Sequence, residues 1–89
     1  MLKSKAEIDK YFEDFLNEKR KLVESAQYIK VPRYKNSTCG LIAAQIGRME
    51  NGKHLSTIKF MDAEIENTDE LREHTKSKAQ DLINDIMKL

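Results

Sequence analysis

Apolar residues recur every three or four positions along residues 4–27, which predicts an amphipathic helix. Ser4 followed by Glu7 forms a capping box, because each side chain can satisfy a free backbone N–H of the first turn. The apolar stripe of this helix consists of Ile8, Tyr11, Phe12, Phe15, Leu16, Leu22, Val23 and Ala26. We expect the helix to bury this stripe in the core of the protein.

A second helix is predicted from about Thr68 to Lys88. Asn67 with Glu70 offers a capping box, and acidic residues in the first turn suit the positive end of the helix dipole. The apolar residues of this helix crowd into its second half, whereas residues 72–78 offer almost none. We therefore expect the first half of the helix to be exposed to solvent or to contact a partner.

The middle of the chain predicts three strands. Residues 28–31 alternate between polar and apolar and stop at the only proline, as an edge strand does. Segments 41–49 and 55–65 flank Asn51 and Gly52, a dipeptide that is the strongest short hairpin signal available. The predicted fold class is α+β, a small domain built as helix, three-stranded antiparallel sheet and helix.

An all-α helical bundle is the alternative fold. The apolar residues within 41–49 also fit one face of a helix, and Gly52 would then end that helix in a left-handed conformation. The alternation within 55–65 breaks between Phe60 and Met61, which would require a bulge in a strand.

The length of 89 residues predicts a single domain, residues 1–89. A chain of this size buries only about 60–65% of its unfolded surface, and the first helix is longer than such a core needs. We therefore predict a homodimer, in which a second copy adds to the core. The predicted core consists of Ile8, Phe12, Phe15, Leu22, Ile42, Ile46, Ile58, Phe60, Leu82 and Ile86.

The charges are segregated along the chain, although the net charge is only +1. This balance excludes a strongly basic histone-like protein and a strongly acidic mimic of DNA. Residues 19–35 carry six basic groups against Glu24, and residues 62–73 carry six acidic groups against Arg72. Such blocks are an argument about partners rather than about the fold.

The basic block contains tyrosines as well as cations, and both suit nucleic acid. Lysine and arginine gain affinity for phosphates by releasing counterions, and aromatic rings stack on unpaired bases. The candidate nucleic-acid-binding residues are Lys19, Arg20, Lys21, Tyr28, Lys30, Arg33, Tyr34 and Lys35. We therefore expect a small non-enzymatic module that binds RNA or single-stranded nucleic acid. The predicted order of elements resembles that of double-stranded-RNA-binding domains, a topological analogy that favours RNA.

Two other interpretations of the basic block stay open. Basic residues at the end of the first helix would complement its negative dipole end, and residues 28–40 would then be a solvated connector. Alternatively, the chain is a protein-binding inhibitor or regulator, antitoxin-like or a phage-type accessory protein. Such a protein would dock on its partner through complementary charge.

Nothing in the sequence predicts an enzyme, a cofactor or a metal site. Cys39 has only His54 and His74 as possible bases, and these three residues lack the paired short spacing of a zinc site. The three glycines match no phosphate-binding loop. One cysteine makes no internal disulfide, and no apolar run has the length of a signal peptide or a membrane span. We therefore expect a soluble, cytoplasmic protein.

Overall fold

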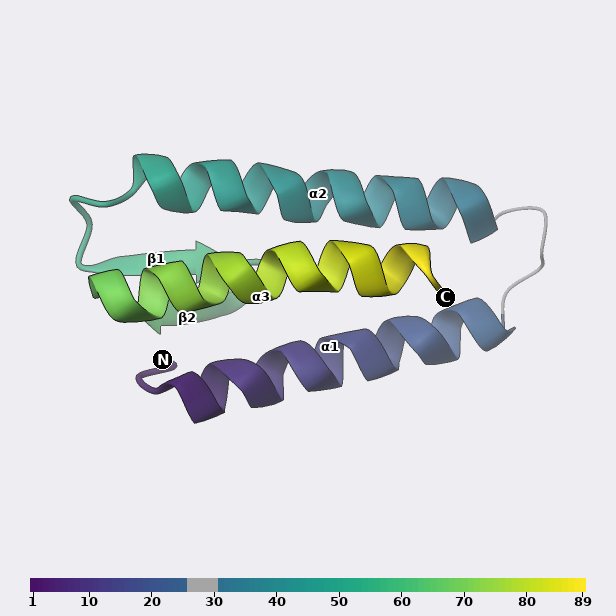
Figure 1. Ribbon diagram of the computed structural model, residues 1–89, viewed down its shortest axis with the longest axis horizontal. Coiled ribbons are helices and arrows are strands. Elements are labelled where there is room, and N and C mark those ends of the chain that lie inside the picture. Colours follow the sequence, from purple (N-terminus) through teal and green to yellow (C-terminus); the bar gives the residue numbers. More distant parts are fainter. Residues whose placement is uncertain (26–30) are drawn as a thin grey trace.

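The computed structural model describes residues 1–25 and 31–89, which form three helices and one hairpin. In chain order the elements are α1 (Lys5–Ser25), α2 (Val31–Asn51), β1 (Thr57–Phe60), β2 (Ala63–Glu66) and α3 (Asp69–Met87). Helix α3 lies between α1 and α2, and the hairpin lies behind the helices at the end where α3 begins (Figure 1). The fold class is thus α+β. Within the described parts of the chain, no helix combines the length and apolar character needed to cross a membrane.

The prediction of a strand over 41–49 is wrong, because this segment belongs to α2. The buried residues Thr38, Ile42 and Met49 are four and seven positions apart, so they share the face of the helix that packs against α3. The sheet of the described residues therefore has two strands and not three. Of the predicted strand over 28–31, Val31 begins α2, and residues 28–30 lie outside the described residues.

The hairpin turns at Met61 and Asp62, not at Asn51 and Gly52. Strands β1 and β2 pair antiparallel with Phe60 opposite Ala63, so the break in alternation after Phe60 is the turn itself rather than a bulge. Met61 takes a positive φ of 53°, and the Tyr11 hydroxyl of α1 donates a hydrogen bond to the Asp62 carboxylate. Gly52 does not end α2 in the left-handed conformation, since no described glycine has a positive φ.

Leu2 covers the outer edge of β2. Its N–H donates to the Glu64 carbonyl at 2.8 Å, and its carbonyl accepts from the Glu66 N–H at 2.9 Å. Ser4 caps α1 as predicted, because its hydroxyl oxygen accepts from the Glu7 N–H at 3.2 Å. The segment before α1 is therefore held against the sheet.

The core is a continuous cluster between the helices and the inner face of the hairpin. Its centre is aromatic, with the rings of Phe12 and Phe60 4.7 Å apart between centroids. Phe15 and Ile46, which were predicted as core, pack against it half-buried. The prediction for Leu22 is wrong: it is 44% exposed because the last turns of α1 extend beyond the hairpin. The buried apolar residues are Ile8, Phe12, Ile42, Met49, Ile58, Phe60, Ala63, Ile65, Leu71, Ala79, Leu82 and Ile86.

One face of the first half of α3 is buried, contrary to the prediction, although Asp69, Glu70 and Glu73 are exposed. Arg72 and Thr75 are 6% and 0% exposed, because α3 is the central helix and has α1 on one side and α2 on the other (Figure 1). Thr75 satisfies its own hydroxyl by donating to the Leu71 carbonyl at 2.7 Å. The N-cap is Thr68 rather than Asn67, and its side chain accepts from the Leu71 N–H at 3.1 Å.

Candidate nucleic-acid interface

The structure places basic residues from two helices at the same end of the molecule. Helix α1 ends and α2 begins at the same end of the molecule, opposite to the end where α3 begins (Figure 1). Tyr28 and Lys30 of the predicted set lie outside the described residues. We call the five described cations the basic tip: Lys19, Arg20 and Lys21 of α1, and Arg33 and Lys35 of α2.

The cations of the basic tip are not neutralised by neighbouring acids. Among the described residues, none of the five forms an ion pair. Arg20 donates to the neutral side chain of Asn17 at 2.8 Å, and Arg20, Lys21 and Arg33 are exposed. Most of the acidic block lies elsewhere, because Glu66, Asp69, Glu70 and Glu73 stand where β2 ends and α3 begins (Figure 1).

Tyr34 of α2 contributes to the tip by holding a lysine. The Nζ atom of Lys19 lies 4.8 Å from the centroid of the Phe15 ring and 5.9 Å from that of Tyr34. An ammonium group at such distances from aromatic faces is attracted by about 0.5–1 kcal/mol. The Tyr34 ring is half-buried, and its buried hydroxyl has no partner among the described residues. Tyr34 therefore links the two helices at the tip.

The helix dipoles do not make the tip positive, so its basic side chains decide its potential. The carboxyl ends of α1 and α3 each contribute roughly −0.5 of a charge at this end of the molecule, and the amino end of α2 contributes roughly +0.5 (Figure 1). The first turn of α2 contains no acidic residue, and Pro32 fits there because an N–H of the first turn needs no intrahelical partner. Acids lie near part of the tip, since Lys19 lines a hollow together with Glu18 and Asp62. The stretch from Lys19 to Lys35 nevertheless carries six basic groups against Glu24 alone.

The geometry does not place a nucleophile beside a base. The Cys39 thiol donates to the Ile83 carbonyl at 3.7 Å, and burial raises the pKa of this thiol although Lys35 opposes the shift. His74 instead bonds Asp9 of α1 at 2.7 Å. It precedes Ile83 by nine positions on α3, roughly 13 Å along the helix. Within residues 1–25 and 31–89, no group of three or more His, Cys, Asp or Glu side chains could hold a metal ion.

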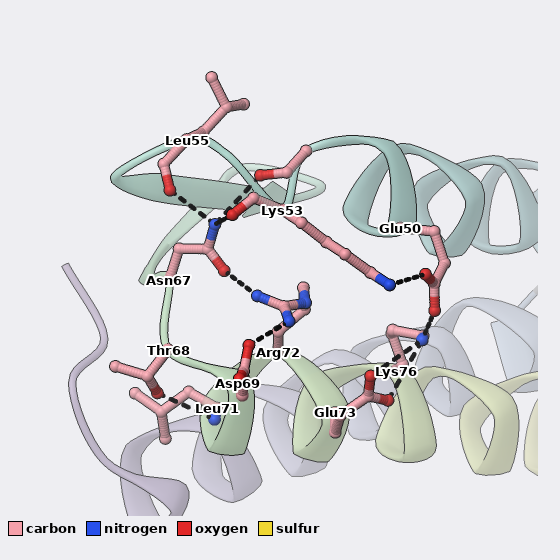
Figure 2. A network of polar contacts seen from close by, with 11 residues as sticks. Glu50, Lys53, Leu55, Asn67, Thr68, Asp69, Leu71, Arg72, Glu73 and Lys76 are labelled. Carbon is pink, nitrogen blue, oxygen red and sulfur yellow. Dashed lines mark hydrogen bonds and ion pairs between the residues drawn. The ribbon is translucent and has the colours of Figure 1, made fainter.

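The hairpin end of the molecule carries a polar network that sequence reasoning missed. The amide nitrogen of Asn67 donates to the carbonyls of Leu55 at 2.6 Å and Gly52 at 3.0 Å (Figure 2). The third carbonyl, that of Lys53, lies 3.3 Å away. The amide oxygen accepts from the buried Arg72 guanidinium at 2.8 Å, so Asn67 joins the 52–56 loop to α3. The sequence predicted only a helix cap at Asn67. Its hydrogen-bond partners are distant along the chain, so they leave no local pattern that could reveal the network.

Ion pairs extend the network toward α2. Lys76 of α3 bonds Glu50 at the end of α2, and it also reaches Glu73 at 3.2 Å (Figure 2). Lys53 approaches the other oxygen of Glu50 at 3.2 Å. The Arg72 guanidinium also pairs with Asp69. Glu50, Lys53, Asp69, Arg72, Glu73 and Lys76 are therefore engaged with one another.

In comparisons with known proteins, no family model, no curated protein and no solved structure matches this chain. The analogy with double-stranded-RNA-binding domains is wrong, because it rested on a helix–three-strand–helix order. The observed order is two helices, two strands and one helix.

Proposed function

We propose that the protein is a non-enzymatic binding module whose basic tip contacts the phosphates of a single-stranded nucleic acid, RNA in the first place. The observation that supports this is that the cations of α1 and α2 lie at the same end of the molecule and have no ion-pair partner among the described residues. Exposed unpaired cations bind phosphates at little cost, because no existing ion pair has to be broken.

The expected affinity is weak and depends strongly on salt. Each phosphate neutralised on a single strand contributes about 0.7 to the slope of log K against log salt, so five contacts give a slope of about −3.5. The net charge of +1 adds little long-range attraction. Binding should therefore be measurable at low salt and nearly lost at moderate salt.

The test is a titration of a short fluorescent single-stranded RNA, followed by anisotropy at several salt concentrations. The double variant Arg33→Ala/Lys35→Ala should bind more weakly, with a slope about 1.4 smaller in magnitude. The matched control is Lys5→Ala/Lys10→Ala, which removes the same charge from exposed positions in the first half of α1. Absence of binding at low salt, or equal losses in the two double variants, would refute the proposal.

A second candidate function is a protein-directed inhibitor or regulator that docks through the same tip. Leu22 favours it, since this apolar side chain is 44% exposed beside Lys21 and could form the apolar centre of a charged interface. Leu22→Ser separates the two candidates. It should leave RNA affinity unchanged, whereas it should weaken docking on an acidic protein.

A further inference from the structure

A groove of about 380 Å³ lies between the second half of α2 and β1. Its apolar lining includes Met49 and Ile58, which are 1% and 3% exposed, and Leu55, which is 51% exposed. Its polar lining includes Arg48 of α2 and Lys59 of β1. The groove therefore offers an apolar strip with a cation on each long side.

The backbone of β1 faces this groove with unused hydrogen-bonding groups. Leu2 bonds the Glu64 carbonyl and the Glu66 N–H, so the backbone N–H and C=O groups of these two residues of β2 point away from β1. Their partners in the register, Lys59 and Thr57, then form the non-hydrogen-bonded pairs of the ladder. The N–H and C=O groups of Thr57 and Lys59 consequently point to the outer side of β1.

The outer edge of β1 is the open edge of the sheet. No described residue makes a backbone hydrogen bond to the outer side of β1, whereas Leu2 covers the corresponding edge of β2. An uncovered edge of this kind is a template for another strand. The open edge lies where the groove separates it from α2.

The charges of the groove select the partner. Arg48 and Lys59 form no ion pair with a described residue, although Glu64 stands opposite Lys59 in the register. Glu50 is the nearest acid in sequence to Arg48, and its carboxylate is occupied by Lys53 and Lys76. The groove is therefore cationic.

The wall of the groove is held in place before any ligand arrives. Asn67 fixes the 52–56 loop through three carbonyls, and the Leu55 side chain points away from this network (Figure 2). Leu55 lines the groove, so its exposed side chain is available to an apolar residue of a ligand. A preorganised wall lowers the entropic cost of binding.

We propose that this groove binds an extended acidic segment of a partner protein, which adds as a strand to the outer edge of β1. The segment would pair its backbone with Thr57 and Lys59, place apolar side chains against Met49 and Leu55, and place carboxylates near Arg48 and Lys59. A second copy of this chain fits less well. Pairing of two β1 edges would place the Lys59 side chains of the two copies near each other, and like charges repel across paired strands. This site is separate from the basic tip.

The probe is a short, terminally blocked peptide of alternating valine and glutamate, titrated into the 15N-labelled full chain. We expect backbone amide shifts at Thr57, Lys59 and Arg48, and slower hydrogen exchange of the Lys59 amide. The decisive control is the same peptide N-methylated at alternate amides, which keeps charge and side chains but cannot pair as a strand. It should bind about tenfold more weakly, as expected for the loss of one or two net hydrogen bonds.

Two protein variants give an independent test. Lys59→Pro removes an edge N–H that β2 does not use, and it should lose binding, while Lys59→Ala removes only the charge and should weaken it less. Arg48→Ala, on the facing helix, should also weaken binding. If Lys59→Pro does not fold, then Arg48→Ala and the N-methylated peptide decide the question.

Several outcomes would overturn the proposal. These are equal binding of the N-methylated peptide, equal binding of a valine–lysine peptide, or shifts confined to the basic tip. Concentration-dependent shifts along β1 without peptide would show that a second copy occupies the edge, which would also overturn it. Loss of RNA binding in the tip variants does not bear on this site, since the two sites share no residue.

Discussion

The hairpin end and the basic tip treat charge in opposite ways. At the hairpin end, Arg72 is 6% exposed and bonds Asn67 and Asp69, and Lys76 bonds Glu50 and Glu73. At the tip, the exposed cations of α1 and α2 have no ion-pair partner among the described residues. The network of paired charges and the basic tip thus lie at opposite ends of a molecule 42 Å long.

Burial explains this difference. A charge that leaves water needs partners, because an unpaired buried charge costs several kcal/mol. The tip extends beyond the hairpin and stays hydrated, so its cations need no partner and their field remains available to a ligand. Substitutions at the hairpin end should therefore change the free energy of unfolding, and substitutions at the tip should change binding.

The largest effect is expected for Asn67→Ala. Three carbonyls lose their shared donor and the buried Arg72 loses an acceptor, so the free energy of unfolding should fall by about 2–4 kcal/mol in urea titrations. The matched control is Asn17→Ala near the tip, which should cost less than about 0.5 kcal/mol because Asn17 is exposed. Equal losses of unfolding free energy in the two variants would show that the hairpin end contributes no more to stability than the tip does.

Gly52→Ala should destabilise the protein by about 1–3 kcal/mol, which is typical of overpacking. A Cβ at this position would lie 3.1 Å from the Arg48 carbonyl oxygen and 3.3 Å from Leu55 Cδ1. Thermal unfolding measures the effect. An unchanged melting temperature would mean that the 52–56 loop yields easily, and that the wall of the groove is not preorganised.

Gly40→Ala/Gly47→Ala should have the opposite sign. A Cβ at either position meets nothing within 4 Å, so alanine should stabilise α2 by about 1 kcal/mol per site. The variant also sharpens the prediction of a homodimer. Unchanged association in sedimentation would place the dimer contact away from this face of α2, and weakened association would place it there.

Asp9→Asn should reduce the acid sensitivity of the fold. A hydrogen bond from His74, with help from Lys78, holds the pKa of Asp9 below its ordinary value of 3.8. A lowered folded-state pKa adds stability above the unfolded value, and this stability is lost as the pH falls through the folded value. The variant should therefore lose less stability than the wild type below about pH 4. Glu24→Gln, near the tip, is the control and should follow the wild type.

The smallest effect on stability is expected for Lys21→Ala/Arg33→Ala. Both side chains are exposed, so the free energy of unfolding should change by less than about 0.5 kcal/mol while RNA affinity falls. Urea titration and RNA anisotropy on the same samples check both expectations. A loss above about 1 kcal/mol would show that the tip contributes to stability and would contradict the comparison.

Periodic burial explains which parts of the fold could be predicted. The stripe of α1 from Ile8 to Leu16, the Ser4 cap and the inward residues of β1 depend on spacing within a few residues, and these predictions are confirmed. The stripe fails at Leu22, which is exposed. The segment 41–49 was ambiguous because short apolar runs with small residues fit a helix face and a strand equally well. Packing of α2 against α3 selected the helix.

For the candidate site, the sequence predicted the cations but not their arrangement. Lys19 of α1 reaches the ring of Tyr34 of α2 only because the two helices run in opposite directions. The network of Asn67 could not be predicted, since its acceptors precede it by 12 to 15 positions. The sequence also could not predict which edge of the hairpin stays open. That depends on Leu2, which covers the edge of β2 although it precedes Glu64 by 62 positions.

The sequence by itself determined the amphipathic faces, the cap of α1 and the separation of basic from acidic residues, because these follow from neighbours along the chain. Only the tertiary structure decided that Arg72 and Thr75 in the polar first half of α3 are buried and that Met61 and Asp62 form the turn. It also decided which charges are paired and which remain open to a ligand. Burial and hydrogen bonding between distant residues fix these features, and no local pattern records them.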